Sequence, residues 1–418
     1  MAGGLLRAFG IACLIAGSNF GLGAASAQDA PSPAPAPSPS PSPQCRGSAG
    51  YAADFDGRRT FLWRPDWLHG IKAAAAADPE IAKGIRSAAE SALASGPYSV
   101  TDKTKLPPGA SANDYVSIGP YWWPDPKKKD GLPYIRKDGE VNPERDGPEF
   151  DKDRLRNLAN AVRDLAVGHY VTGEERYARH AALLLRTWFI TPATRMNPSF
   201  AFAQGIPGKV AGRGEGIIEA SHLSTIVEAA GLLEPTDVLS PDEHNALRAW
   251  YRDFVVWMAT SENGEDEMRK ANNHGLFYDF YLAHFALFAG AENAAENVAK
   301  AFPEYRLGRQ MDRQGRFIAE LKRTRSWHYS VYAVEAAARL ATIAECVGLD
   351  LWTTRLEDGR GLDTARQFLA RYAADPASWP FPDSDLDRGR IERMRAEYAE
   401  LAALFPDAAQ DMTLAALP

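Results

Sequence analysis

Apolar residues recur at helical spacing along most of this chain, and that pattern limits the folds open to it. Leu155, Leu158 and Val162 share one helix face, and Leu247 and Phe254 share another in the same way. Similar segments run near residues 78–95, 174–189, 216–233, 275–289, 331–347, 362–373 and 390–404. Strand-like alternation is scarce, which argues against a βα architecture. We therefore predict an all-α fold of stacked helices, such as a helical toroid, with a cleft lined by loops at one end.

The first 27 residues carry the pattern of a secretory signal peptide. Arg7 provides the positive charge, residues 8–16 are apolar, and Ala25-Ser26-Ala27 is a small-residue cleavage site. A membrane anchor is the alternative, but the apolar run is shorter than the roughly 20 residues that a span requires. We expect a mature chain without a membrane span, exported to the periplasm or, alternatively, to the extracellular space.

A linker follows the signal peptide. Residues 28–44 alternate Pro with Ser and Ala, which favours an extended segment over a packed one. No second linker interrupts the remainder, so residues 45–418 are expected to form one large domain or two closely packed lobes. The sequence leaves the oligomeric state open.

Charge and cysteine content exclude some classes of protein. A net charge of −7 over 418 residues argues against a nucleic-acid partner. Only Cys45 and Cys346 remain after signal removal, too few for a zinc site built from cysteines. Export permits a disulfide between them, and a buried free thiol at Cys346 is equally compatible with the sequence.

Two long segments break the helical pattern, near residues 104–149 and 191–215. Both are rich in Gly, Pro, aromatic and basic residues. Long irregular segments inside a compact domain are usually functional or disordered, and the aromatic content argues against disorder. The first contains Tyr121-Trp122-Trp123, aromatic residues that suit stacking on sugar rings or stapling of the loop to the body. The lysines at 127–129 are interpreted as a solvated turn.

The segment Asn272-Asn273-His274-Gly275 stands at the start of an apolar helical run. Two carboxamides and an imidazole place hydrogen-bond donors and a possible base where helix amides also point outward. The alternative is that one Asn caps the helix and His274 simply packs. We favour a functional role for the complete triplet.

A second polar segment precedes another helix. Arg323, Arg325, His328, Tyr329 and Tyr332 gather there, and positive charge can lower the pKa of a tyrosine so that it exchanges protons. The alternative is a helix with a solvated basic end.

These motifs together resemble the alginate lyase family of polysaccharide lyases. The matching segments, in order between about 114 and 350, are YVSIGPYWWPDP, GLPYIRKDGEVNPE, MNPSFAFAQGIPG, GRGEGIIE, NNHG and ELKRTRSWHYS. The resemblance implies an (α/α) toroid or incomplete (α/α) barrel with long active-site loops, and β-elimination on an anionic polysaccharide without a cofactor or metal. The polymer would be a polyuronate, either alginate (polymannuronate) or glucuronan.

The resemblance also assigns roles to individual residues. Tyr329 matches the catalytic tyrosine, Asn273 and His274 the pair at the substrate carboxylate, and Arg323 the catalytic-site arginine. Arg323 lies six residues before Tyr329, and Lys322 occupies the seventh position, where the alginate lyases proper carry their arginine. This spacing is more like that of the branch that cleaves glucuronan and alginate.

Elimination requires these residue types. Removing the weakly acidic C5 hydrogen of a uronate places negative charge on the C6 carboxylate, which amide and imidazolium groups can neutralise. One tyrosine can serve as base and acid in mannuronate or glucuronate, whereas guluronate needs two groups, His274 and Tyr329. Arg323 would lower the pKa of Tyr329. The expected substrate-binding residues are Asn272, Glu267 (if protonated), Trp122, Trp123, Gln204, Arg213 and Arg325.

Two other functions remain open at this stage. A glycoside hydrolase on a similar toroid would need paired carboxylates, for which Asp114, Glu215 and Asp279 are candidates. A non-catalytic exported carbohydrate-binding protein would keep the aromatic loop and arginines but would not need Tyr329.

The signal-peptide interpretation makes a direct prediction about the mature chain. Because the small-residue site ends at Ala27, protein purified from the exported fraction should begin at Gln28. Intact-mass spectrometry measures this directly. Exported protein that retains residues 1–27 would contradict the interpretation.

Overall fold

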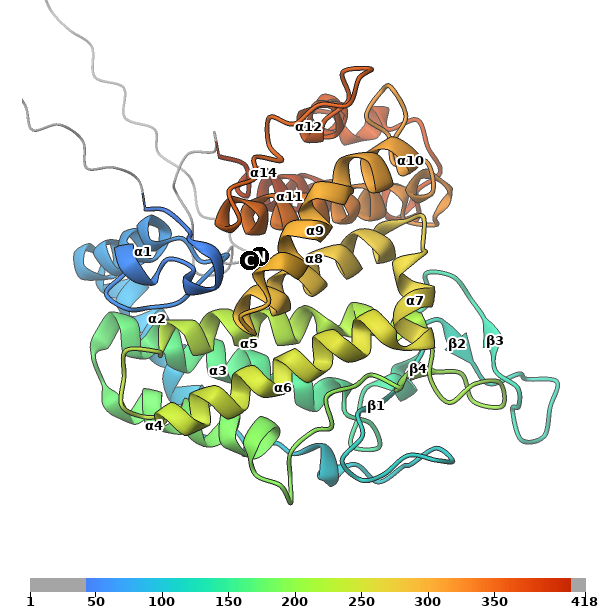
Figure 1. Cartoon of the computed structure of the whole chain (residues 1–418). Helices are drawn as coiled ribbons and strands as arrows, with labels where there is room; N and C mark the ends of the chain where they lie inside the picture. The colour runs from blue at the N-terminus through green and yellow to red at the C-terminus, as the bar shows by residue number, and fades with distance from the viewer. Residues whose placement is uncertain (1–42, 407–418) are drawn as a thin grey trace, which may run out of the picture. The chain divides into compact units, whose positions relative to one another are not determined.

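The computed structural model describes residues 43–406, and most of them are helical (Figure 1). The longer helices are α1 (Pro65–Ala77), α2 (Pro79–Leu93), α3 (Lys152–Thr172), α4 (Glu175–Leu185), α5 (Ser221–Leu232), α6 (Pro241–Thr260), α8 (Asn273–Phe288), α9 (Glu292–Phe302), α11 (Ser326–Cys346), α12 (Leu362–Ala373) and α14 (Ile391–Ala402). Shorter ones are α7 (Glu262–Met268), α10 (Gly308–Gln310) and α13 (Ser384–Asp387). The predicted signal peptide and nearly all of the predicted linker lie outside the described residues.

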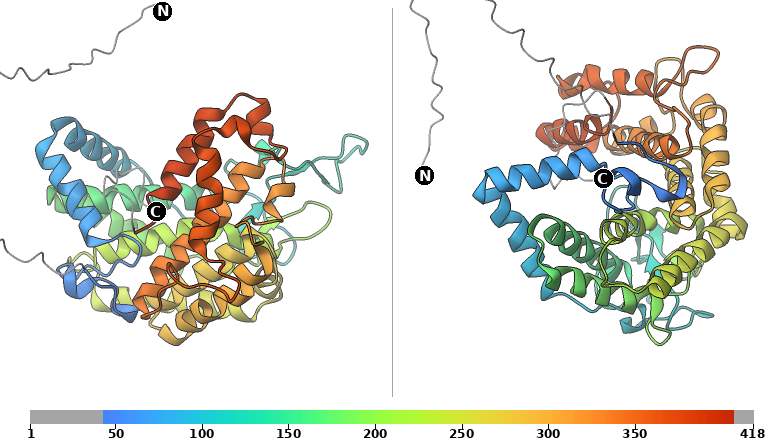
Figure 2. Two further views of the ribbon diagram at one scale, coloured as in Figure 1. Left: turned by 90° about the horizontal axis from the view of Figure 1, so that it is seen from above. Right: turned by 60° about the vertical axis from the view of Figure 1, so that its left-hand side comes forward.

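The helices of residues 43–406 form an inner and an outer row. Helices α3, α5, α8 and α11 contact one another in sequence, whereas α2, α4, α9 and α12 each pack against one of them. The inner helix α8 is apolar on all sides and almost entirely buried, while the outer α2 and α9 bury one stripe. Figure 2 shows the helices following one another along a curved path. This alternation of inner and outer helices is the arrangement of an (α/α) toroid.

Buried polar contacts attach the N-terminal segment to this body. Cys45 and Cys346 form a disulfide, which resolves the alternative that the sequence left open. The buried carboxylate of Glu228 accepts hydrogen bonds from the backbone N–H groups of Phe61 and Trp63. His284 lies 2.7 Å from the same carboxylate. Residues 45–63 are therefore fixed to α5, α8 and α11.

The two long irregular segments come together at one end of the helices (Figure 1). Strand β1 (Val116–Ile118) of the first segment pairs in parallel with β4 (Phe202–Gly205) of the second. Strands β2 (Trp122–Trp123) and β3 (Ile135–Arg136) form a separate antiparallel pair. The two segments expected to line a cleft are thus joined to each other by the β1–β4 pair.

The helical periodicity located most elements correctly. All the segments proposed from sequence correspond to helices, although residues 214–220 form a 3-10 helix before α5. Helices α1 and α9 were not anticipated from the sequence. No helix within residues 43–406 has the length and apolar character needed to cross a membrane.

Candidate active site

The Asn-Asn-His-Gly motif forms the first turn of α8. Asn272 is the N-cap, and its Oδ1 accepts a hydrogen bond from the backbone N–H of His274 at 3.1 Å. This leaves the side chains of Asn273 and His274 free of the capping role. Gly275 is required by space, since a Cβ there would lie 2.2 Å from the backbone oxygen of Lys270. Both interpretations of the motif therefore hold for different residues. Asn272 caps the helix, whereas Asn273 and His274 remain available for a functional role.

The imidazole of His274 contacts a buried carboxylate. Its Nδ1 lies 2.5 Å from Oε1 of Glu267, which belongs to α7 and is fully buried. Burial alone lowers the pKa of His274, but the carboxylates of Glu267, Glu215 and Glu320 outweigh it, so that its pKa is raised. The contact with Glu267 therefore favours the imidazolium form of His274. Glu267 does not line the pocket, so its expected contact with substrate is replaced by a contact with His274.

Arg323 and Tyr329 are stacked on each other. Tyr329 lies in the first turn of α11. The guanidinium carbon of Arg323 lies 3.7 Å from the centre of its ring. Arg323 also pairs with Asp138 at 3.2 Å. Lys322, one position earlier, is exposed. The six-residue spacing thus places the guanidinium of Arg323 against the ring of Tyr329.

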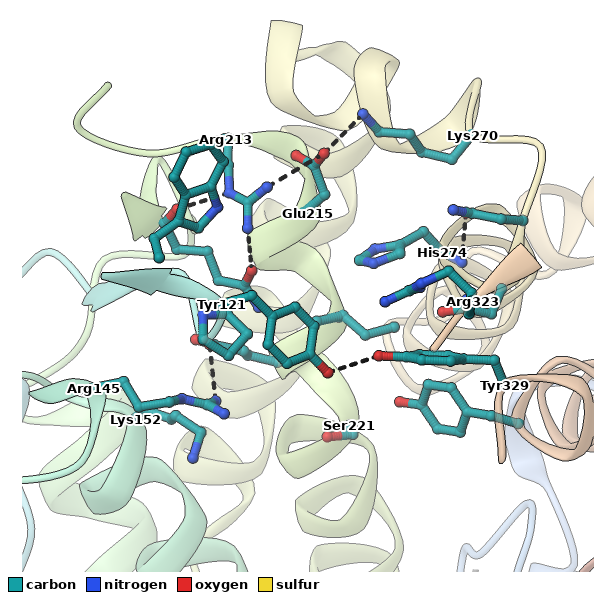
Figure 3. A pocket seen from close by; sticks show the side chains of 18 of the residues that line it. Tyr121, Arg145, Lys152, Arg213, Glu215, Ser221, Lys270, His274, Arg323 and Tyr329 are labelled. Atoms are coloured by element: carbon teal, nitrogen blue, oxygen red, sulfur yellow. Dashed lines mark hydrogen bonds and ion pairs between the residues drawn. The ribbon is translucent and has the colours of Figure 1, made fainter. Parts of the chain in front are cut away.

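Tyr329 meets a second tyrosine from the opposite side of the pocket. Its hydroxyl lies 2.6 Å from the hydroxyl of Tyr121, a residue of the first irregular segment (Figure 3). Burial and Tyr121 raise the pKa of Tyr329, and Arg323 opposes that rise only in part. Arg323 thus acts on the pKa of Tyr329 in the expected direction, but the net pKa is raised. Desolvation of the phenolate outweighs a single cation.

Gln204 and Arg213 form one unit beside these groups. Arg213 donates hydrogen bonds to the backbone oxygen of Gln204 at 2.9 Å and to its Oε1 at 2.8 Å. Gln204 has a φ of 47°, a left-handed conformation that is uncommon for a residue other than glycine. Such backbone strain often occurs at functional sites, where the surrounding structure maintains it.

These side chains line one pocket with a volume of about 580 Å³. Figure 3 shows Arg145 and Lys152 on one side of it, with His274, Arg323 and Tyr329 opposite. Residues lining it that carry positive charge are Arg136, Arg145, Lys152, Arg213, Lys270 and Arg323, and the acidic ones are Glu215 and Glu219. Burial together with Lys152, Arg156 and Arg145 lowers the pKa of His222 to about 4. The excess of cations suits an anionic ligand.

The structure brings together most residues selected from the sequence. Asn272, Asn273, His274, Arg323, Tyr329, Gln204, Arg213 and Trp122 all line the pocket. Trp123 does not line it: its indole N–H donates to the backbone oxygen of Glu140. Arg325 also lies outside, because its guanidinium is 2.8 Å from the carboxylate of Asp385. For these two residues, the substrate contact expected from the sequence is not supported.

Several pocket residues were not identified from the sequence. Arg145, Lys152, Lys270 and His222 come from separate elements and form no local motif. Tyr121 was noted only as one of three adjacent aromatic residues. Its pairing with a residue 208 positions away has no signal in the linear order.

The carboxylates considered for a hydrolase are not paired across the pocket. Asp279 is buried in a two-point ion pair with Arg306, and Asp114 accepts hydrogen bonds from Ser111 and Asn197. Only Glu215 of the three lines the pocket, where Arg213 and Lys270 flank it. Within residues 43–406, no group of three or more His, Cys, Asp or Glu side chains is arranged to hold a metal ion.

Comparison with known proteins gives two kinds of similarity. The family model described as alginate lyase matches residues 99–379. An alginate lyase from Bacteroides ovatus of known structure is 33% identical, with a TM-score of 0.76, and the match covers 86% of this chain and 99% of that one. Alginate lyase A1-III from Sphingomonas species A1 is 18% identical, with a TM-score of 0.47 over 78% of this chain and 87% of that one. Among curated proteins, none matches significantly.

The position of Arg323 predicts how the pocket binds an anion. Replacing Arg323 by Ala should weaken binding of an anionic oligosaccharide by about ten- to a hundredfold, the size of a hydrogen bond to a charged group. Lys128→Ala, at an exposed turn outside the pocket, should change binding less than about twofold because exposed charges are screened. Isothermal titration calorimetry measures both. Equal losses in the two variants would show that the anion binds elsewhere.

Proposed function

Because the chain belongs to the alginate lyase family, and is by that membership a polysaccharide lyase, we propose that this pocket cleaves a polyuronate by β-elimination. The observation that carries the proposal is the convergence of Tyr329, Asn273, His274 and Arg323 on one cationic pocket. These are the groups that carboxylate neutralisation and proton transfer require.

Three side chains are available to neutralise the C6 carboxylate of the substrate. When the C5 hydrogen leaves as a proton, negative charge develops on the C6 carboxylate, and groups already aimed at it stabilise the transition state. Asn273 offers an amide N–H, His274 an imidazolium and Arg323 a guanidinium. Because these groups are fixed by Glu320, Glu267 and Asp138, they need little reorganisation during the reaction.

His274 serves this charge and does not act as the base. Its Nδ1 is engaged by the buried Glu267, which raises the pKa of the imidazole and favours its protonated form. An imidazolium has no lone pair with which to remove a proton. His274 would then not supply the second base that guluronate needs, and the proposal favours mannuronate- or glucuronate-like residues.

Tyr329 performs both proton transfers. As phenolate, its Oη takes the C5 proton, the C4–O4 bond breaks as the C4–C5 double bond forms, and the departing O4 receives the proton from Oη. Tyr329 returns to the phenolate, and the products are a chain with a new reducing end, whose anomeric hydroxyl carries the former O4, and a chain with an unsaturated uronate at its non-reducing end. C5–H and O4 lie on the same face in mannuronate and glucuronate, so one group can reach both.

Tyr329 must lose its own proton before the cycle starts. Burial and the Tyr121 hydroxyl favour the phenol, whereas Arg323 against the ring favours the phenolate. Arg323 is thus the group that stabilises the base.

The polymer is assigned as alginate, with mannuronate at the cleaved position. The Bacteroides ovatus neighbour is described as an alginate lyase, which supports alginate over glucuronan. The protein acts after export, in the periplasm, as the signal-peptide pattern of residues 1–27 supports.

Tyr329→Phe tests the mechanism directly. The change removes one oxygen and keeps the ring that packs against Arg323, so the protein should fold. General acid–base groups contribute roughly 10²–10⁴-fold, and loss of a group with both functions should reach at least the upper end. Ultraviolet absorbance of the unsaturated product from polymannuronate measures the rate.

The matched control is Tyr134→Phe, since the Tyr134 hydroxyl also makes a side-chain hydrogen bond, in its case to the carboxylate of Glu144, but Tyr134 does not line this pocket. Its activity should remain within about twofold of the wild type, as expected for a change distant from the chemistry. A folded Tyr329→Phe protein that retains most of its activity would remove Tyr329 from the mechanism.

A further inference from the structure

Glu320 is a buried carboxylate that has no part in the proton transfers described above. It belongs to the 3-10 helix Glu320–Lys322, just before Arg323, and its side chain has no solvent exposure. Oε1 accepts the backbone N–H of Asn273 at 2.6 Å, and Oε2 accepts its side-chain Nδ2–H at 2.9 Å. One carboxylate therefore binds both the backbone N–H and the side-chain amide of Asn273.

This contact determines which end of the Asn273 amide faces the ligand. The oxygen and nitrogen of a carboxamide have similar size, so sterics alone do not fix its orientation. An ionised carboxylate can only accept, which requires the nitrogen end of the amide to face Glu320. One N–H is used in that bond, and because Asn273 lines the pocket, the second N–H is the donor it can offer to a ligand. The reversed amide would direct its carbonyl oxygen at a substrate carboxylate and repel it.

We propose that Glu320 is a positioning residue that holds the Asn273 amide with its N–H toward the uronate carboxylate, a role that rests on the proposed function. Glu320 itself touches no substrate, since it does not line the pocket. It acts through Asn273 and sets the direction of one neutralising hydrogen bond before the substrate arrives. Such preorganisation is most useful in the transition state, where the carboxylate charge has grown.

The groups around Glu320 offset part of the cost of burying its charge. Burial raises the pKa of Glu320, and the two donors of Asn273 together with Arg323 and His274 oppose that rise. Its charge lies close to two cations that also face the pocket. An unpaired buried carboxylate would be costly, so Asn273 and Glu320 depend on each other.

Glu320→Gln tests the role because it keeps the size of the side chain and adds an N–H donor. One of the two Asn273 donors then faces a donor, and the fixed amide orientation is lost. The kcat on polymannuronate should fall by about ten- to a hundredfold while KM stays within about threefold, as for a contact strengthened in the transition state.

The discriminating measurement is the same substitution in an Asn273→Ala background. If Glu320 acts only through the Asn273 side chain, Glu320→Gln should change the kcat of Asn273→Ala by less than about threefold. Should the loss instead have its full size in both backgrounds, the positioning role is overturned. Wild-type protein that makes no unsaturated product overturns the proposed function itself, which separates the two failures.

A matched control comes from Glu292, which accepts the backbone N–H and hydroxyl of Ser48 at the surface, away from the pocket. Glu292→Gln breaks a contact of the same kind and should leave kcat unchanged. If Glu320→Gln does not fold, Glu320→Asp replaces it, since a shorter carboxylate remains acceptor-only. Its smaller loss of kcat must also disappear in the Asn273→Ala background, and a loss that persists there overturns the role.

Discussion

The chemistry of the pocket depends on two carboxylates that are buried directly behind the side chains facing the ligand. Glu267 lies behind His274 and Glu320 lies behind Asn273, and neither has measurable exposure to solvent. Burying a carboxylate is costly unless hydrogen bonds and opposite charge compensate it. The contacts of the two carboxylates therefore favour a protonated imidazole in one case and a single amide orientation in the other. Under the proposed function, these groups are in place to neutralise a substrate carboxylate before any ligand enters.

The two sides of the pocket come from different parts of the chain. The irregular segments joined by β1 and β4 supply Tyr121, Gln204 and Arg213, while α8 and the start of α11 supply Asn273, His274 and Tyr329. The 2.6 Å contact between Tyr121 and Tyr329 connects the two sides. Because the inner helices α8 and α11 pack closely, the catalytic side has a rigid base, and the loop side provides most of the additional cations.

Much of this arrangement could be predicted from the sequence, and the remainder could not for definable reasons. The resemblance to the alginate lyase family, the (α/α) fold and the assignment as a polysaccharide lyase are confirmed. Local motifs succeeded where neighbouring residues act together, as in Asn272–His274 and Arg323–Tyr329. They did not anticipate that Trp123 and Arg325 contact Glu140 and Asp385 and are not among the residues that line the pocket. The raised pKa of Tyr329 could not be predicted from the sequence either, since it comes from burial and from Tyr121.

The central claim is that Tyr329 alone moves protons while His274 remains a cation, so that elimination is restricted to residues with C5–H and O4 on the same face. The most direct test compares wild-type kcat/KM on polymannuronate and on polyguluronate of matched length, by ultraviolet absorbance of the unsaturated product. The account predicts a preference for polymannuronate of at least about a hundredfold, the size of one missing acid–base group. Comparable rates on the two polymers would contradict it, because guluronate cannot be cleaved without a second base on the opposite face.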